Sequence, residues 1–355
     1  SPGPFRFKRV RGFFAAVRQY SVALFSLAGV SESANVRSVI LSSDLVVLNG
    51  GNLLRCESLR DFIRLTAFVY PVLLAKFYRK PYIIFPQSTS RINYFGKKLL
   101  GCVFEDARAI WVREKSSLEV FTQHFPKVVF RYAPDMAFNI EPISEGPLLL
   151  SEPGGRKSGA VVKVAVTLRD FGIGDIGPLP PIVRRRIVST IGDVLRQLSG
   201  SEFLDLTLVV QCDVDRAVTN EVFGTVQELL SLGNFRVTIL DARDTYELLE
   251  FYKSQDLLLG MRLHSIVLAL SVGTPCVGYF DHGWGLKNPG LLKAFDLPCF
   301  FVANDPSAIV DAAKAILQNV GIYRASILEM VGRERVAFRE ECAGLLYCNR
   351  NGVPL

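Results

Sequence analysis

The chain has 355 residues, 49% of them hydrophobic and 21% charged, which is enough apolar material for about two globular domains. This composition excludes disorder as the main state, because a disordered chain combines low hydrophobicity with high net charge. The formal net charge is +7, but the first 20 residues hold five basic and no acidic side chains, which leaves +2 for the rest. A basic surface spread over a folded face, as nucleic-acid-binding proteins have, is therefore not expected.

The basic N-terminal segment, FRFKRVRGFFAAVRQY, interleaves phenylalanine with arginine. Two interpretations stay open: an ordinary first helix with a solvated basic face, or peripheral contact with an anionic membrane surface. A membrane-spanning segment is not predicted, because the longest uncharged apolar run, Leu65–Ala75, has 11 residues and a span needs about 20.

The first half of the chain alternates short β-branched runs with longer helical stretches, a pattern typical of βαβ units and a parallel sheet. We expect residues 1–145 to form an N-terminal α/β domain on this ground. Its strands are predicted at Leu45–Leu48, Tyr82–Phe85, Ala109–Val112 and Val128–Arg131. Its helices are predicted around residues 58–77, 91–104 and 115–124.

The stretch from Glu141 to Ala160 is rich in proline, glycine and serine, and we predict an interdomain linker at residues 146–160. Residues 161–355 are expected to form a C-terminal α/β domain, so the fold class is α/β with two Rossmann-like domains whose parallel sheets face across a cleft. The strands of this domain are predicted at Lys163–Leu168, Leu206–Gln211, Arg236–Leu240, Leu257–Leu259, Cys276–Tyr279 and Phe300–Val302. Its helices are predicted near residues 182–199, 216–231, 244–253, 263–271, 306–318 and 322–345.

Seven cysteines are scattered through the chain without CxxC or CxxxH spacing. Neither a zinc site nor a disulfide framework is predicted from them, and a reducing compartment fits best. We expect no metal ion at the functional site.

The most informative stretch is Gln255–Tyr279, with the sequence QDLLLGMRLHSIVLALSVGTPCVGY. A buried strand ends there at Gly260 and a helix begins, which places Arg262 and His264 at a helix N-terminus where an anion is favoured. A guanidinium adds bidentate recognition of phosphate or carboxylate, and an imidazole titrates near neutral pH as a proton donor should. The alternative is a capping arginine and an ordinary core histidine.

Two further cations follow predicted strand ends of the second half. Arg169 comes directly after the strand that ends at Leu168, although a surface ion pair with Asp170 would also explain it. Lys287 lies in the loop after the strand that ends at Tyr279, together with His282, and either an anion ligand or a solvated lysine fits this position.

Polar residues also follow the predicted strands of the first half. Two glycines after a buried strand allow close approach of the backbone to a ligand, but they have neither the GxGxxG nor the P-loop spacing. Asp135 is the carboxylate best placed to accept a proton from a sugar hydroxyl, with a helix cap as the alternative. The strand-end candidates of this half are Asn49, Gly50, Gly51, Gln87, Ser88, Arg113, Glu114 and Asp135.

The order of these motifs resembles the polysaccharide pyruvyltransferase family over about residues 36–320. The Arg-Leu-His block with Gly-Thr-Pro after it is the most specific part. The chain departs from the family pattern in having no recognisable first strand with a Gly-Asp turn. The motifs are Asp44-Leu-Val-Val-Leu-Asn-Gly-Gly, Pro86-Gln-Ser, Val112-Arg-Glu-Lys-Ser-Ser, Asp135-Met-Ala-Phe, Arg169, Gly260-Met-Arg-Leu-His-Ser and Gly273-Thr-Pro.

The resemblance implies a fold like that of the GT-B glycosyltransferases, and transfer of pyruvate from phosphoenolpyruvate to a sugar of a glycan or glycan precursor as a cyclic ketal. It implies a phosphoenolpyruvate site at Arg169, Arg262, Leu263 and His264, to which Lys287 is added. We expect His264 to act as the acid and Asp135 or Glu114 as the base. The N-terminal domain is expected to hold the acceptor, and no cofactor is expected beyond phosphoenolpyruvate as co-substrate.

Two other functions stay open. A nucleotide-sugar glycosyltransferase of the same architecture would use the same cations to hold a diphosphate, and a degenerate transferase fold would have no catalytic activity at all. The acceptor is expected to be a sugar or glycan, with a lipid-linked acceptor as one option. Two localisations fit: the cytoplasm, with a position peripheral to the inner membrane as one option, or the Golgi lumen if the chain is eukaryotic.

Overall fold

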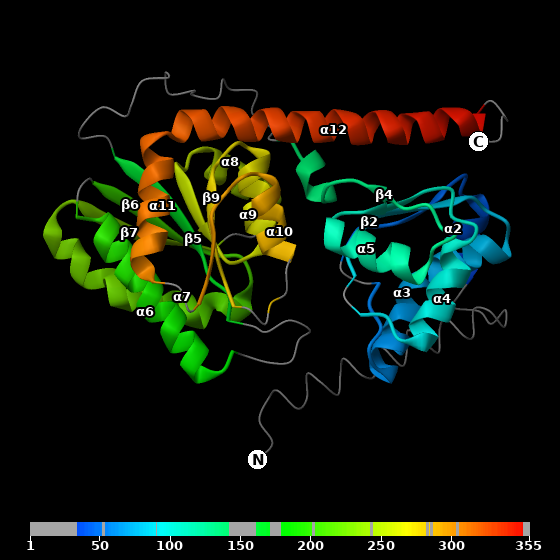
Figure 1. Ribbon diagram of the computed structural model, residues 1–355, viewed down its shortest axis with the longest axis horizontal. Coiled ribbons are helices and arrows are strands. Elements are labelled where there is room, and N and C mark those ends of the chain that lie inside the picture. The colour runs from blue at the N-terminus through cyan, green and yellow to red at the C-terminus, as the bar shows by residue number, and fades with distance from the viewer. Residues whose placement is uncertain are drawn as a thin grey trace, which may run out of the picture. The chain divides into compact units, whose positions relative to one another are not determined.

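The computed structural model describes residues 34–51, 54–89, 91–141, 161–170, 179–200, 203–241, 244–281, 284, 287–302 and 305–350. The chain divides into two compact units, one up to Met136 and one from Ala137 (Figure 1). The basic N-terminal segment and the predicted linker at 146–160 lie outside the described residues.

The first unit contains a parallel sheet in the order β1-β2-β3-β4. Helices α3 and α4 pack against each other, and α3 also packs on β1 and β2. The strands are β1 (Val46–Leu48), β2 (Tyr82–Gln87), β3 (Ile110–Val112) and β4 (Arg131–Tyr132). The helices are α2 (Ala34–Ser42), α3 (Leu59–Phe77), α4 (Tyr94–Phe104) and α5 (Lys115–His124).

Local sequence explains where α3 begins. Ser58 and Asp61 form a capping box, in which the Ser58 hydroxyl accepts from Asp61 N at 3.2 Å and Asp61 Oδ2 accepts from Ser58 N at 3.2 Å. These bonds satisfy two backbone N–H groups that would otherwise lack a partner. The helix then buries an apolar stripe that includes Leu65, Val69 and Val72 in the core of this unit.

One predicted strand is wrong in its position. The sequence indicated Val128–Arg131, but the strand is Arg131–Tyr132, which pairs with Trp111 and Val112 of β3. The apolar run ahead of it serves a different purpose, because Phe130 packs against other aromatic rings, with its centroid 5.4 Å from that of Phe104. An apolar run that fills a core from a loop looks the same in the sequence as a buried strand.

The second unit contains a six-stranded parallel sheet in the order β10-β9-β8-β5-β6-β7. The order reverses between β5 and β8, as in the doubly wound dinucleotide-binding fold, and ligands of such sheets bind at the carboxyl ends of the strands at this switch point. The strands are β5 (Val162–Thr167), β6 (Leu204–Val210), β7 (Phe235–Asp241), β8 (Leu257–Gly260), β9 (Cys276–Phe280) and β10 (Cys299–Phe301).

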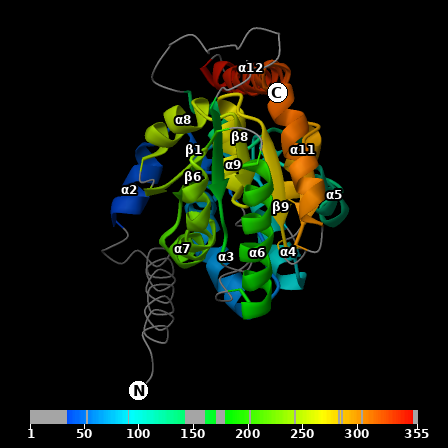
Figure 2. The ribbon, with the colours of Figure 1, turned by 90° about the vertical axis from the view of Figure 1, so that its left-hand side faces the viewer.

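Helices cover this sheet in two groups. Helix α6 packs against both α7 and α11, and α8 packs against α9 (Figures 1 and 2). The sequence did not reveal α10, nor α2 in the first unit. The helices are α6 (Pro181–Leu198), α7 (Arg216–Val226), α8 (Thr245–Lys253), α9 (Leu263–Ser271), α10 (Lys287–Ala294), α11 (Pro306–Gln318) and α12 (Val320–Arg350). None of the described helices is long and apolar enough to span a bilayer.

The Gly-Thr-Pro block ends α9 and leads into β9. Gly273 has a φ of +79°, which an L side chain rarely adopts, and its N–H donates to Leu270 O at 3.0 Å. Thr274 is fully buried, and its hydroxyl donates to Tyr252 O at 2.6 Å. This motif therefore fixes the C-terminal end of the helix whose N-terminus carries Arg262 and His264.

Candidate functional site

The two arginines predicted for the donor flank the switch point of the second sheet. Thr167 of β5 and Gly260 of β8 are paired neighbours in the sheet. Arg169 and Arg262 each follow one member of this pair by two residues. The structure therefore brings the carboxyl ends of both strands, and the two arginines, to the same edge.

Arg262 is held by a buried carboxylate that the sequence did not point to. Its Nε and Nη2 donate to Asp215 Oδ2 and Oδ1 at 2.7 and 2.5 Å, and Asp215 is only 1% exposed. Asp215 belongs to the short helix that follows β6 (Asp213–Asp215). Such a two-pronged contact fixes the plane of the guanidinium, and 18% of the Arg262 side chain is exposed.

Asp215 also ties the two strand ends together. Its Oδ1 accepts a hydrogen bond from the backbone N–H of Asp170 at 3.0 Å. Asp170 follows Arg169 directly, so one buried carboxylate holds the chain after β5 and the side chain after β8. Asp215 therefore connects the backbone that follows Arg169 with the side chain of Arg262.

Asp170 itself is the second buried acid at this edge. It is 4% exposed and pairs with Arg184 of α6 at 2.9 Å. Burial raises the pKa of the Asp170 carboxyl above its usual value. The Arg184 guanidinium lowers this pKa, whereas the charges of Asp215 and Glu221 raise it. The ion pair between Arg169 and Asp170, which the sequence left open as an alternative, is not formed, because Asp170 pairs with Arg184 instead.

Arg169 lies against an aromatic ring. Its guanidinium carbon is 4.9 Å from the ring centroid of Trp284, a cation–π arrangement. Trp284 is 6% exposed, and its indole Nε1 has no hydrogen-bond partner. The hydroxyl of Thr167 is likewise buried without a partner. Both groups belong to residues beside Arg169, since Trp284 lies under its guanidinium and Thr167 precedes it by two residues.

The remaining donor candidates lie at the start of two helices. Arg262 is the N-cap residue of α9, and Leu263 and His264 form its first turn. Leu263 is half-buried against the core, whereas His264 is exposed. Lys287 begins α10, but its side chain and the whole of His282 lie outside what the structure describes.

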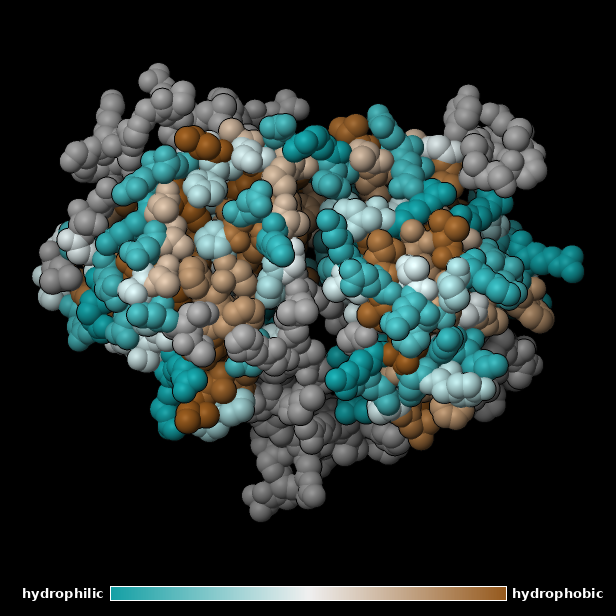
Figure 3. Space-filling model, in the orientation of Figure 1, coloured by the Kyte–Doolittle hydropathy of each residue, from teal (hydrophilic) through white to brown (hydrophobic). Residues whose placement is uncertain are grey.

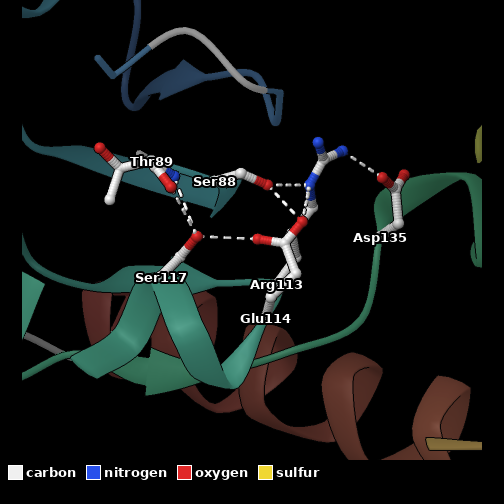
Figure 4. Close-up of polar contacts among 6 residues, drawn as sticks. All are labelled: Ser88, Thr89, Arg113, Glu114, Ser117 and Asp135. Atoms are coloured by element: carbon white, nitrogen blue, oxygen red, sulfur yellow. Dashed lines mark hydrogen bonds and ion pairs between the residues drawn. The ribbon is translucent and has the colours of Figure 1, made fainter. Parts of the chain in front are cut away.

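Four of the candidates in the first unit meet in one hydrogen-bonded cluster (Figure 4). Arg113 is at its centre, with a side chain that is 8% exposed. Its Nε donates to Ser88 Oγ and to Glu114 Oε1, the latter at 3.0 Å, and its Nη1 donates to Asp135 Oδ2. These residues follow β2, β3 and β4, so the carboxyl edge of this sheet carries one cation and two carboxylates.

The two carboxylates of the cluster differ in their surroundings. Glu114 accepts from Ser88 Oγ at 2.5 Å through Oε1 and from Ser117 Oγ at 3.0 Å through Oε2. Both Glu114 oxygens are thus engaged in holding the cluster together. Asp135 contacts Arg113 from the end of the next strand, and 15% of its side chain is exposed. The sequence did not single out Ser117, which lies one helical turn after Glu114.

The glycine turn after β1 lies beside this cluster. A side chain at Gly50 would put its Cβ 2.8 Å from Pro86 O, so the turn can approach β2 only with glycine there. Gln87 Nε2 donates to Asn49 O at 2.5 Å, and Ser88 N donates to Gly51 O at 2.7 Å. Gln87 Oε1 is buried without a partner.

Carboxylates, histidines and cysteines do not gather into a metal site within the described ranges: no group of three or more of them could hold an ion. The residues that sequence reasoning missed are Asp215 and Trp284, and Ser117 was quoted only as the last residue of the Val112-Arg-Glu-Lys-Ser-Ser motif, without a role. Asp215 was within reach of the same argument, because Asp213-Val-Asp215 also follows a buried strand.

Comparisons with solved structures place the fold. A glycosyltransferase from Rickettsia africae is 12% identical over 86% of this chain and 80% of its own, with a TM-score of 0.50. Anabaena HepE, solved with UDP and glucose, is 11% identical over 88% and 81%, with a TM-score of 0.48. MurG from Acinetobacter baumannii is 13% identical over 84% and 72%, with a TM-score of 0.42. The fold is of the GT-B-like α/β class.

Comparison with family models identifies the chain more closely. No curated protein matches its sequence. The family model for polysaccharide pyruvyl transferase matches residues 5–282, which include the strand-end clusters of both units. The expected resemblance is thereby confirmed, and this chain belongs to the polysaccharide pyruvyl transferase family.

Proposed function

We propose that the chain transfers pyruvate from phosphoenolpyruvate to a sugar of a glycan or glycan precursor, forming a cyclic ketal and releasing phosphate. The observation that carries this proposal is that buried Asp215 accepts two hydrogen bonds from the Arg262 guanidinium at the switch point of the second sheet. The guanidinium charge is fixed in place before any ligand arrives, as binding of an anion requires.

The donor site we propose is the carboxyl edge of the second sheet. Phosphoenolpyruvate carries a phosphate and a carboxylate close together, and Arg169 and Arg262 supply two cations at one edge. The N-terminus of α9 adds backbone N–H groups that lack partners within the helix. The unpaired Nε1 of Trp284 and hydroxyl of Thr167 offer further hydrogen bonds.

The proposed chemistry begins with proton transfer to the methylene carbon of phosphoenolpyruvate, for which His264 is the acid. This turns the CH2 group into CH3 and leaves an oxocarbenium-like C2. A first sugar hydroxyl adds to C2 and loses its proton. A second hydroxyl then displaces phosphate, so that two C–O bonds form, the C–O bond to phosphate breaks, and the second hydroxyl proton leaves with phosphate or the base. The scheme needs no metal ion and no cofactor beyond the donor.

The acceptor side we propose is the cluster of the first unit. Asp135 would take the proton from the sugar hydroxyl, since both Glu114 oxygens already hold the cluster together. Arg113 and Ser88 would position hydroxyl groups, with Asn49, Gly50, Gly51 and Gln87 lining the same edge. Lys287 remains a proposed ligand of the leaving phosphate.

A thermal-shift titration tests the donor. Phosphoenolpyruvate should raise the melting temperature, because a ligand that binds only the native state adds roughly 2.7 kcal/mol at 100 times its Kd. Removing Arg262 alone would leave the buried carboxylate of Asp215 without its cation. The test variant therefore combines Arg262→Met with Asp215→Asn. Loss of the shift in this variant is expected. A shift with UDP- or GDP-sugars and none with phosphoenolpyruvate would favour a glycosyltransferase instead.

The acid role of His264 needs its own measurement. His264 is exposed, so His264→Ala should fold normally and still bind phosphoenolpyruvate. Release of phosphate in the presence of glycan acceptors is expected to fall by a factor of about 10²–10⁴, the usual share of a general acid. Turnover close to that of the wild type would rule the role out.

A further inference from the structure

A surface of the first unit combines exposed aromatic rings with basic side chains. Leu59, Tyr94 and Phe95 are 76%, 68% and 65% exposed, although side chains of this size are usually covered. Arg60, Arg91 and Lys98 are exposed beside them. We call these six residues the aromatic–basic patch.

The patch residues lie at or just before the starts of two helices, α3 and α4, that pack against each other. Leu59 and Arg60 open α3, and Tyr94 and Phe95 open α4, while the chain just before each helix is joined by the bridge between Cys56 and Ile92. Figure 3 shows one face of this unit, on which separate brown residues lie among teal ones.

Ring contacts link the two helices. The Phe95 ring lies 6.1 Å from that of Phe62 in α3 and 5.7 Å from that of Tyr94, edge to face. Lys98 Nζ is 5.6 Å from the centroid of the Tyr94 ring. Tyr94 and Phe95 therefore contact neighbouring side chains while they stay 68% and 65% exposed, as expected for side chains that insert into a partner.

The net charge of the patch indicates which kind of partner binds it. The acids nearby are Glu57, which pairs with Arg91 at 4.0 Å, and Asp61, which belongs to the capping box. The patch is thus net positive, and it does not suit a second copy of itself. It does not suit the chain's own first 20 residues either, because these carry five basic and no acidic side chains. An anionic lipid surface satisfies both the cations and the rings.

We propose that the aromatic–basic patch docks the first unit onto an anionic membrane surface. Tyr94 and Phe95 would enter the headgroup region, where amphipathic rings are favoured, and the basic residues would face the lipid charges. Each Lys or Arg near such a surface strengthens binding by about fivefold.

The patch lies at the same edge of the first sheet as the proposed acceptor site. In a βαβ unit the helix begins at the carboxyl edge of the preceding strand, so the first turns of α3 and α4 lie at the edge that carries the Arg113 cluster. Thr89 connects the cluster to the chain ahead of α3: its N–H donates to Ser117 Oγ at 3.0 Å and its hydroxyl to Leu54 O at 2.8 Å. On the basis of the proposed function, a lipid-linked acceptor sugar would be presented at this edge.

Vesicle sedimentation tests the proposal with the full chain. Vesicles of phosphatidylcholine alone are compared with vesicles that also contain phosphatidylglycerol. The variants are Tyr94→Ser with Phe95→Ser, and Arg60→Gln with Lys98→Gln. The matched control is Phe77→Ser with Lys127→Gln, which removes a 71% exposed ring from the far end of α3 and one exposed lysine.

The wild type and the control should bind the anionic vesicles, and both patch variants should lose at least tenfold in partition coefficient. Equal binding of patch variants and wild type would overturn the proposal and assign any binding to another part of the chain. Equal binding to neutral and anionic vesicles, or none to either, would also overturn it. The phosphoenolpyruvate thermal shift of the same variants should be unchanged, which separates this proposal from that of the donor site.

Discussion

Replacing Asp215 by alanine should destabilise the second unit by about 3–5 kcal/mol, the usual cost of removing one partner of a buried ion pair. Asp215 is 1% exposed and accepts three hydrogen bonds: from Arg262 Nε at 2.7 Å, from Arg262 Nη2 at 2.5 Å and from Asp170 N at 3.0 Å. Alanine removes this acceptor from all three donors and leaves the Arg262 charge largely buried.

Differential scanning calorimetry measures this effect. In a unit of this size 1 kcal/mol shifts the melting temperature by roughly 2–4 °C, so Asp215→Ala should lower it by about 6–20 °C. The matched control is Asp241→Asn, which breaks a pair with Arg216 at 2.6 Å whose side chains are 39% and 41% exposed. Water and salt weaken an exposed pair of this kind, so Asp241→Asn should lower the melting temperature far less than Asp215→Ala.

A double-mutant cycle with Arg262→Met then tests whether the two residues act as a pair. Removal of either partner strands the other charge, whereas removal of both does not, so the double variant should lose less stability than the two single variants together. Additivity within about 0.5 kcal/mol would refute the idea that Asp215 holds Arg262.

Three other predictions concern the surroundings of the two clusters. Burial raises the pKa of the Asp170 carboxyl above its ordinary value of 3.8, although Arg184 lowers it. Asp170 therefore stabilises the fold below pH 3.8, and this contribution is lost as the pH rises through the pKa of the folded protein. In thermal melts above pH 3.8, the melting temperature of Asp170→Asn should depend less on pH than that of the wild type. Gly273→Ala should cost about 1–3 kcal/mol in urea unfolding, because φ is +79° and the new Cβ would lie 2.8 Å from Leu328 Cγ, whereas Gly224→Ala in α7, with open space around it, should not destabilise. Arg113→Met should abolish acceptor-dependent phosphate release yet leave the phosphoenolpyruvate thermal shift intact, and loss of that shift would contradict the assignment of donor and acceptor to different units.

The sequence located the strand ends well, and with them most of the candidate site. Nine of its ten predicted strands overlap the observed ones by at least two residues, because short apolar β-branched runs between amphipathic helices leave few other readings. Arg169, Arg262, Arg113 and Asp135 were then found by one rule, that ligands gather at the carboxyl ends of parallel strands. The exception, Val128–Arg131, failed because apolar side chains in a loop can fill a core as well as those of a strand.

The sequence could not predict which side chains from distant parts of the chain form pairs. Arg262 and Asp215 are 47 residues apart, and nothing local indicates that they meet. Which acid pairs with which arginine depends on strand order, since β5 lies between β6 and β8, and strand order is a tertiary property. The stacking of Arg169 on Trp284 was hidden for the same reason. Helix α10 was missed because its first turn, Lys-Asn-Pro-Gly, is typical of a turn.

Isothermal titration of phosphoenolpyruvate into three proteins tests the central claim most directly: the wild type, the Asp215→Asn/Arg262→Met variant and the Asp241→Asn control. The site predicts saturable binding to the wild type and to the control, and a Kd at least tenfold weaker for the paired variant, because a guanidinium–anion contact contributes about 1.5–3 kcal/mol. Equal affinity for all three proteins would contradict the claim that the Arg262–Asp215 pair forms the donor site.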